Sequence, residues 1–137
     1  MRYLARREYS RVELHSKLLP YVTEGEDVDV VLEELVSRGW LSDARASTQL
    51  VQSKRSRFGV QRIAHELRQK GIPEDLIDCA MPELKVSELE TAREVWQRKF
   101  GRIPVDEKEK AKQIRFLQSR GFSIDVIFKV MRESTPQ

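Results

Sequence analysis

The features that mark secreted or membrane proteins are scarce in this sequence. It holds a single cysteine, Cys79, so no internal disulfide can form, which fits a reducing compartment. No apolar run approaches the ~20 residues that a membrane-spanning helix needs. The first residues are charged and lack the apolar core of a signal peptide. We therefore expect a soluble, cytoplasmic protein that does not associate with membranes.

Residues that could carry catalysis or hold a cofactor are equally sparse. The two histidines, His15 and His65, have no metal-ligand spacing with Cys79 or with paired acids. The sequence has no G-x-x-x-x-G-K loop that could bind nucleotide phosphates. The isolated glycines indicate the ends of helices instead. We expect no enzyme activity, no cofactor and no metal site.

The sequence also has no stretch of alternating apolar and polar residues and no Asn-Gly or Asp-Gly hairpin signal, so we expect no strand. Helical periodicity is clear instead, best seen between residues 57 and 75. One helical face there is apolar, because four residues follow the i, i+3, i+4, i+7 spacing: Val60, Ile63, Ala64 and Leu67. Gly59 begins this helix and Gly71 ends it, after which Ile72 folds back and Pro73 begins the next helix.

This arrangement occurs three times along the chain. Asp29, Asp75 and Asp125 are each followed by two aliphatic residues and, six positions on, by Leu or Met. An aliphatic helix precedes each aspartate, and an aromatic residue followed by a small one precedes each of those helices, at 9–10, 58–59 and 100–101. A helical period in the forties of residues is typical of tandem repeats, whose units must stack to bury their apolar faces.

We therefore predict an all-α protein: three tandem three-helix repeats forming an elongated, curved helical array. The chain is expected to be one domain, with repeat one at 1–42, repeat two at 43–83 and repeat three at 84–137. Capping boxes at 10–13 and 87–90 and single caps at Asp27, Asp106 and Ser123 mark helix starts. The first of nine helices should end near Glu8, and the helix that begins at Pro73 should end near 81–82. An apolar residue follows each of three basic-Gly pairs, namely Trp40, Ile72 and Phe122. We interpret these residues as apolar contacts at helix ends rather than as surfaces on which nucleobases stack.

The charge is strongly patterned although the net charge is only +3. Residues 44–70 hold seven basic residues against one acid and residues 95–121 hold eight against three, whereas 23–43 and 71–94 hold seven acids each. Stacked units would place these charges in stripes, either as a binding surface for an acidic partner or as a solvated surface. The binding candidates recur at one corner of the repeat: Lys54, Arg55, Arg57, Arg62, Arg68, Lys70, Arg98, Lys99 and Arg102.

With these residues in view, the chain resembles the RecX family, the regulators of the RecA recombinase. The most specific segments are A-R-R-E-Y-S-R-V-E-L at 5–14, G-W-L-S-D at 39–43 and F-G-V-Q-R-I-A-H-E-L-R-Q-K-G-I at 58–72. K-F-G near residue 100 and I-R-F-L-Q-S-R-G-F at 114–122 agree as well. The resemblance covers essentially the whole chain and implies the same fold of three-helix units.

It also implies a non-enzymatic inhibitor that acts in DNA repair, DNA recombination and the SOS response. Such proteins bind RecA filaments on single-stranded DNA and restrain ATP hydrolysis, strand exchange and co-protease activity. Lys54, Arg57, Arg62 and Lys70 match positions that are usually basic in the family. The expected partners are the RecA filament and, weakly, single-stranded DNA, with the protein itself a monomer. Two alternatives stay open: a helical module that binds nucleic acid directly, without RecA, and a purely structural scaffold.

Overall fold

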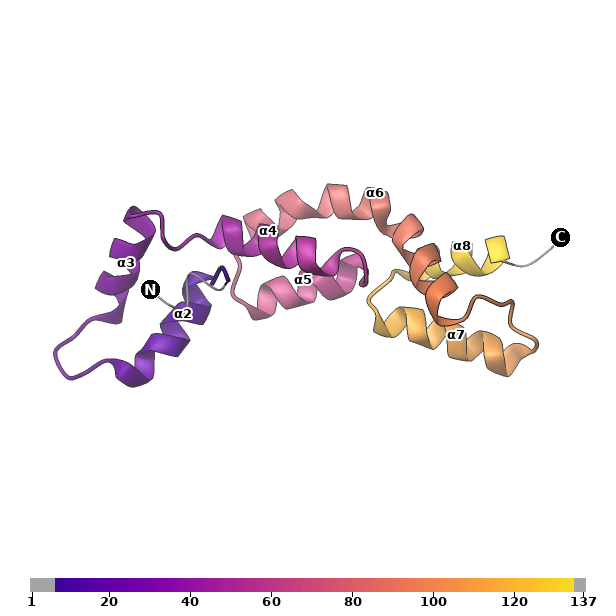
Figure 1. Cartoon of the computed structure of the whole chain (residues 1–137), viewed down its shortest axis with the longest axis horizontal. Helices are drawn as coiled ribbons and strands as arrows, with labels where there is room; N and C mark the ends of the chain where they lie inside the picture. Colours follow the sequence, from indigo (N-terminus) through magenta and orange to yellow (C-terminus); the bar gives the residue numbers. More distant parts are fainter. Residues whose placement is uncertain (1–6, 135–137) are drawn as a thin grey trace.

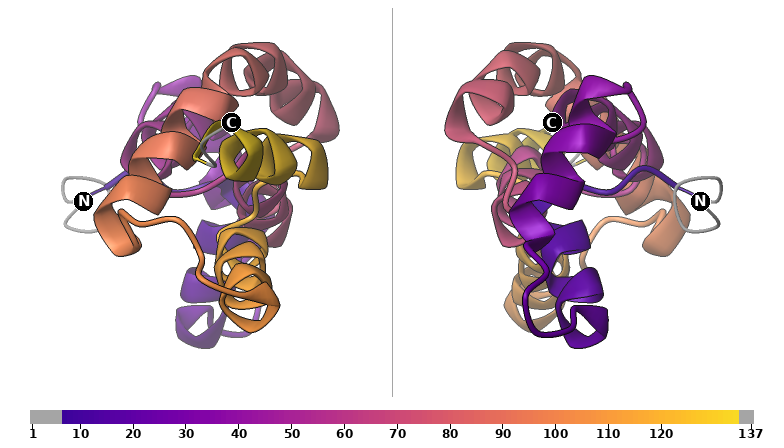
Figure 2. Two further views of the ribbon diagram at one scale, coloured as in Figure 1. Left: turned by 90° about the vertical axis from the view of Figure 1, so that its right-hand side faces the viewer. Right: turned by 90° about the vertical axis from the view of Figure 1, so that its left-hand side faces the viewer.

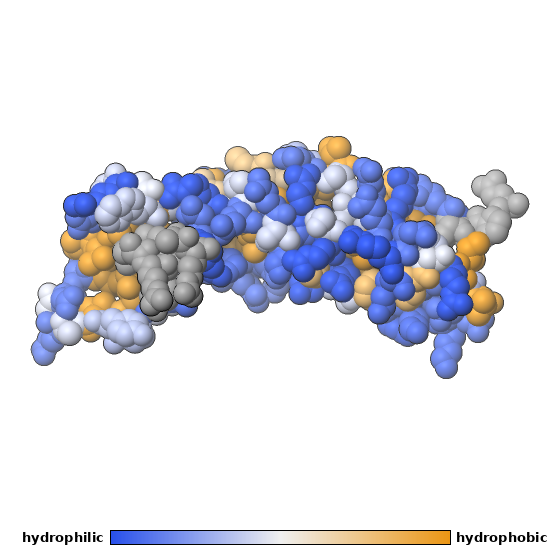
Figure 3. Space-filling view, in the orientation of Figure 1, coloured by the Kyte–Doolittle hydropathy of each residue, from blue (hydrophilic) through white to orange (hydrophobic). Residues whose placement is uncertain are grey.

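The computed structural model describes residues 7–134, and within that range every regular element is a helix. The chain forms an elongated, gently arched array with the first and last helices at opposite ends (Figures 1 and 3). Viewed along its length, the helices of successive units overlap around one long axis (Figure 2). The elements are α2 (Arg11–Leu18), the 3-10 turn η1 (Leu19–Tyr21), α3 (Val28–Ser37), α4 (Asp43–Lys54), α5 (Val60–Gln69), α6 (Glu74–Lys99), α7 (Glu107–Ser119) and α8 (Ile124–Ser134).

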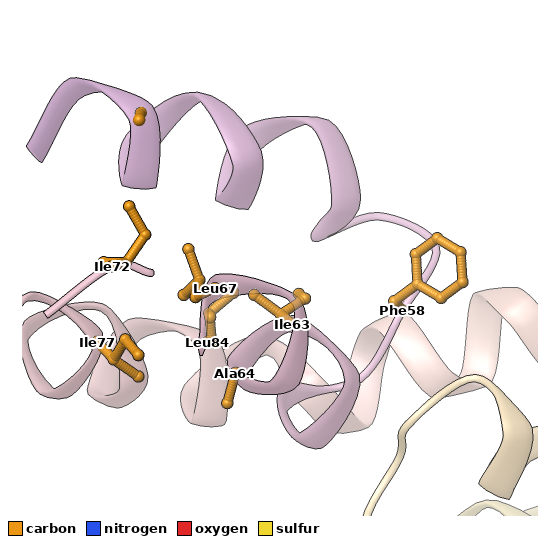
Figure 4. Packing of buried hydrophobic residues seen from close by; sticks show 8 residues of the cluster. Phe58, Ile63, Ala64, Leu67, Ile72, Ile77 and Leu84 are labelled. Atoms are coloured by element: carbon orange, nitrogen blue, oxygen red, sulfur yellow. The ribbon is translucent and has the colours of Figure 1, made fainter. Parts of the chain in front are cut away.

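Three separate apolar clusters hold the array together. The first is formed by α2, α3 and the residues around them, the second by α4, α5 and the first half of α6, and the third by the second half of α6 with α7 and α8. Their fully enclosed members include Leu14 and Leu32, then Ile63 and Leu67 (Figure 4), then Leu117 and Ile127. The predicted all-α array of stacked units is therefore confirmed. Leu84, the first residue of predicted repeat three, packs in the second cluster.

Most of the predicted helix ends are confirmed by their local bonds. The Ser10 hydroxyl accepts from the Glu13 N–H while the Glu13 carboxylate accepts from the Ser10 N–H, which is the predicted capping box. Asp27 caps α3 and Asp106 caps α7 through their carboxylates. Gly71 ends α5 with φ of 75°, a backbone conformation that suits glycine.

The predicted break in the middle of the chain is wrong. α6 runs without interruption from Glu74 to Lys99 and carries Pro82 in its interior. Ser87 does not cap a new helix, because its hydroxyl donates to the carbonyls of Glu83 and Leu84 one turn back. An interior proline costs a helix ~3 kcal/mol or more. This cost is offset because Leu84 is buried in the second cluster and later residues of the same helix are buried in the third. One continuous helix therefore joins the two units.

The helix expected to end near Glu8 falls mostly outside the described residues, and residues 7–10 are not helical. Ile72 and Phe122 are buried helix-end contacts as predicted, but Trp40 is not. Its side chain is half exposed beneath the Arg38 guanidinium, 5.4 Å from the ring centroid, and Leu41 takes the buried place. No helix in the described part of the chain is both long and apolar enough to cross a membrane.

Candidate functional site

The first turn of α5 is capped by the repeat that follows it. Gly59 has no side chain with which to satisfy the free N–H groups of the helix start, and these groups need acceptors. Repeat three supplies them from the loop between α7 and α8 and from the buried carboxylate of Glu88 in α6. The bonds are Gly59 N–H to the Arg120 carbonyl (2.8 Å), Val60 N–H to Glu88 Oε2 (2.8 Å) and Gln61 N–H to the Gly121 carbonyl (3.1 Å).

Two glycines make this close approach possible. A Cβ atom on Gly59 would lie 2.3 Å from the Gly121 carbonyl oxygen, and one on Gly121 would lie 2.1 Å from the Arg62 Cβ. Gly121 also has φ of 88°. The two chain segments therefore touch backbone to backbone, and the Ser123 hydroxyl adds a 3.1 Å bond to Glu88 from the start of α8. This joint fixes how repeats two and three are oriented.

The joint between repeats one and two has the same design. The Ser10 hydroxyl at the start of α2 donates to the Lys70 carbonyl, and the Arg11 N–H donates to Asp43 Oδ1 at 2.8 Å. A Cβ on Gly71 would lie 2.4 Å from the Val12 Cβ, so this glycine too is held by close packing. Each second helix thus begins against the following unit, at equivalent positions of the repeat.

What differs between the two joints is charge. At the first joint the Lys70 ammonium lies 2.9 Å from Glu13 Oε2, so the side chains neutralise each other. Burial raises the pKa of Glu13, but hydrogen bonds from Ser10 and Lys70 and the nearby positive charges outweigh it, so the pKa lies below its ordinary value. At the second joint the matching positions hold Arg62 and Arg120, two cations. Arg62 lies 4.0 Å from Glu66 of its own helix, whereas Arg120 has no carboxylate within 4.0 Å in residues 7–134, so the positive charge at this joint is only partly balanced.

Phe58 is the centre of this positive cluster. Its ring, at one end of the second apolar cluster (Figure 4), is surrounded by four cations. They lie at 4.6 to 5.4 Å from the ring centroid, within range of cation–π attraction: Lys54, Arg57, Arg62 and Arg120. A second ring, Phe116, has Lys99 at 5.4 Å and Arg120 at 5.2 Å. We call these residues, together with Arg98, the basic corner.

A hollow of about 280 Å³ opens at the basic corner. Val95 and Phe116 provide apolar surface in it, and the other lining residues are Arg57, Arg98, Lys99 and Arg120. The corresponding hollow of the first joint, about 540 Å³, is lined by carboxylates as well as cations, since Glu8, Glu13 and Glu66 face it. Of these two hollows, the one at the basic corner is lined by cations without any acid.

The structure divides the nine candidates predicted from the sequence into two groups. Five of them lie within 4.0 Å of a carboxylate: Lys54 and Arg62 near Glu66, Arg55 near Glu83, Arg68 near Glu74, and Lys70 near Glu13. Four make no ion pair within residues 7–134: Arg57, Arg98, Lys99 and Arg102. Arg57 and Arg98 donate instead to the backbone carbonyls of Ser53 and Ser56, both at 3.1 Å.

Two important residues were missed by the sequence reasoning. Arg120 lies between Phe58 and Phe116 and lines the hollow, and its place before Gly121 in a recurring basic-Gly pair was the available signal. Glu88 was assigned to a capping box of its own helix, whereas it is 7% exposed and caps α5 from across the joint. No feature of the neighbouring sequence indicates that Glu88 caps α5.

In the part of the chain that the structure describes, no group of three or more His, Cys, Asp or Glu side chains could hold a metal ion. Cys79 is exposed. The cations that line the hollow at the basic corner suit recognition of an acidic partner.

Comparison with known proteins agrees with this arrangement. Two family models match, RecX second three-helix domain over residues 42–81 and RecX third three-helix domain over residues 87–131. A regulatory protein RecX from Leptothrix cholodnii is 48% identical over 132 residues, which span 96% of this chain and 84% of that protein. One from Chromobacterium violaceum is 44% identical over 93% of this chain and 83% of its own length.

Solved structures give the same fold. The crystal structure of RecX from Lactobacillus salivarius superposes with a TM-score of 0.78 at 20% identity, covering 96% of this chain and 89% of that one. A second crystal structure of a regulatory protein RecX gives 0.76 at 24% identity, over 96% of this chain and 68% of that one. At such identities the superposition supports the fold, whereas the sequence matches establish the relationship. The chain belongs to the RecX family of regulatory proteins.

Proposed function

We propose that this protein is a non-enzymatic inhibitor of the RecA recombinase. It binds RecA filaments on single-stranded DNA in the cytoplasm, as a monomer, and restrains ATP hydrolysis, strand exchange and co-protease activity during DNA repair, recombination and the SOS response. Membership of a family of regulatory proteins supports the regulatory role. The single structural observation that carries the proposal is the cluster of unpaired cations at the joint of repeats two and three.

The binding surface would be centred on the cations that have no carboxylate partner within residues 7–134. These are four of the predicted candidates, Arg57, Arg98, Lys99 and Arg102, joined by Arg120. The ion-paired candidates Lys54, Arg55, Arg62, Arg68 and Lys70 would lie around it, where their charge is already partly used. An elongated array can also reach more than one protomer of a filament at once, and such multivalent contacts raise affinity without any strong single contact.

A direct nucleic-acid-binding module is the second candidate, because the basic corner combines cations with two aromatic rings. Sequence-tolerant binding of single strands relies on bases that stack on free aromatic faces. Here the rings are approached by the protein's own cations, and Phe58 is only 8% exposed. Cation contacts to phosphates remain available, which is consistent with weak binding of DNA rather than with a dedicated platform.

Titration of RecA-catalysed ATP hydrolysis on single-stranded DNA tests the proposal. The protein is added to the cognate RecA at fixed DNA concentration, and its binding to the same DNA without RecA is measured in parallel. We expect inhibition at concentrations well below those that saturate bare DNA. Unchanged hydrolysis together with salt-sensitive DNA binding, with log K falling by ~0.7 per phosphate contact and decade of salt, would favour the nucleic-acid module instead.

A further inference from the structure

The hollow at the basic corner combines an apolar floor with a cationic rim. The floor is formed by Val95, which belongs to the third apolar cluster, and by Phe116, which packs against that cluster. Arg57 reaches the hollow from repeat two, and three more cations reach it from repeat three, so the site exists only where the two repeats meet. Its volume of about 280 Å³ lies just below the range for small-molecule pockets, ~300–1,000 Å³. It is sized for a single side chain rather than for a cofactor.

The rim cations are free to meet charges from outside. Within residues 7–134 none of Arg57, Arg98, Lys99 and Arg120 lies within 4.0 Å of a carboxylate, whereas nearby Arg55 and Arg93 are both ion-paired. Arg57 and Arg98 donate to backbone carbonyls, and these bonds leave most of their guanidinium N–H groups available. Because guanidinium groups bind carboxylates in a two-pronged geometry, the rim is suited to Asp and Glu side chains.

A nucleobase fits the hollow less well than an amino-acid side chain. Phe116 and Phe100 form a T-shaped pair with ring centroids 5.4 Å apart and an interplanar angle of 87°, and the cations of Lys99 and Arg120 also lie against the Phe116 ring. A stacked base would have to displace those groups to reach the ring face. A branched or aromatic side chain needs only apolar surface, which the floor provides.

We propose that the hollow receives one apolar side chain from an acidic segment of a partner protein, with carboxylates on either side of that side chain paired to the rim. Burial of the apolar group gives affinity, and the flanking carboxylates set the position and the rate of encounter. The inference deepens the proposed function and rests on it only in assigning the segment to a RecA filament. The recognition chemistry itself follows from the hollow.

Fluorescence anisotropy with the full chain tests this chemistry. The probes are a labelled peptide with Asp and Glu on both sides of one Phe, the same peptide with Ser in place of Phe, and an oligo-dT of equal formal charge. We expect the Phe peptide to bind about tenfold or more tighter than the Ser peptide, since burying a Phe side chain is worth that much. Equal binding of the two peptides, or tighter binding of oligo-dT than of the Phe peptide, would overturn the proposal.

Two charge-matched double variants locate the binding. Arg57→Gln with Arg120→Gln removes two rim cations while keeping the Arg120 backbone carbonyl that caps α5. Lys85→Gln with Arg115→Gln removes two exposed cations that do not line the hollow. The rim variant should weaken the Phe peptide about tenfold or more, with an unchanged circular dichroism spectrum, and the control should not. Equal weakening by both variants would contradict the assignment.

The same proteins added to the RecA ATPase assay separate the two claims. If the peptides fail to discriminate while wild-type protein still inhibits RecA, the assignment of the hollow is wrong and the proposed function stands. If the peptides discriminate as expected and RecA is unaffected, the hollow is a site for an acidic segment of another protein and the proposed function is wrong.

Discussion

Replacing Glu88 with alanine should weaken the joint between repeats two and three more than any other single loss of a carboxylate. Glu88 is 7% exposed and accepts two hydrogen bonds, from the Val60 N–H at 2.8 Å and from the Ser123 hydroxyl at 3.1 Å. The donors belong to the starts of two different helices, α5 and α8. The substitution therefore removes the acceptor that ties both helix starts to α6.

The magnitude follows from the groups left behind. A buried donor without a partner costs about 1–3 kcal/mol, so two donors cost roughly 2–6 kcal/mol if water does not reach them. That is a large part of the 5–15 kcal/mol that stabilises a typical domain. For a chain of this size each kcal/mol shifts the unfolding midpoint by about 3–4 °C, which predicts a fall of roughly 6–24 °C.

Thermal and urea unfolding followed by circular dichroism measure this loss, with Glu90→Ala as the matched control because Glu90 is exposed on the same helix. Hydrogen exchange adds a local test. The Val60 amide should lose protection, whereas the Arg11 amide, which donates a hydrogen bond to Asp43 at the other joint, should keep it. If Glu88→Ala unfolds within ~0.5 kcal/mol of the Glu90→Ala control, the capping role is wrong.

Two further predictions concern the joints. Gly121→Ala and Gly25→Ala both place alanine at positive φ, but the new Cβ meets atoms of Arg62 at Gly121 and nothing within 4 Å at Gly25. Urea unfolding should therefore show Gly121→Ala to be more destabilising than Gly25→Ala by about 1–3 kcal/mol. Equal losses of unfolding free energy would contradict the close approach at Gly121. The pKa of Glu13 lies below its ordinary value of 4.5, so its ion pair with Lys70 stabilises the fold above that pH and is lost as the pH falls through the lowered pKa. Lys70→Met should therefore flatten the fall in unfolding free energy below about pH 4.5, and an unchanged pH profile would show that the pair does not matter.

Local pattern carried much of the fold prediction. The helix of α5, its glycine ends and the buried Ile72 follow from apolar periodicity and from the positions of the glycines within about fifteen residues of sequence, and the structure confirms them. Recurrence of the same pattern then predicted stacked helical units. These features are determined by neighbours along the chain, which a sequence displays directly.

The joints could not be predicted in the same way. The Ser87–Glu90 segment satisfies the local rule for a helix start, yet burial of Leu84 and Glu88 in two different environments keeps the helix continuous. That preference depends on which units stack against α6, which lies outside any local window. The long α6 is therefore a case in which tertiary packing outweighs both a proline and a capping signal.

Charge was predictable in amount but not in arrangement. The basic stretches were visible in the sequence, but their partners were not, because Glu83 and Glu13 lie 28 and 57 positions from the cations they pair with. Only the structure distinguishes a paired cation such as Arg55 from an unpaired one such as Arg57. Arg120 joined the candidates for the same reason, since it meets Phe58 across the joint.

One comparison of variants shows whether the basic corner makes the contact through which this protein would inhibit RecA. Inhibition of RecA-catalysed ATP hydrolysis on single-stranded DNA is titrated with wild-type protein, with Arg57→Glu plus Arg120→Glu, and with Lys85→Glu plus Arg115→Glu as the charge-matched control. We expect the corner variant to lose inhibition while it keeps its helical spectrum and cooperative unfolding, and we expect the control to inhibit like wild type. Full inhibition by a folded corner variant would show that the basic corner does not make the inhibitory contact.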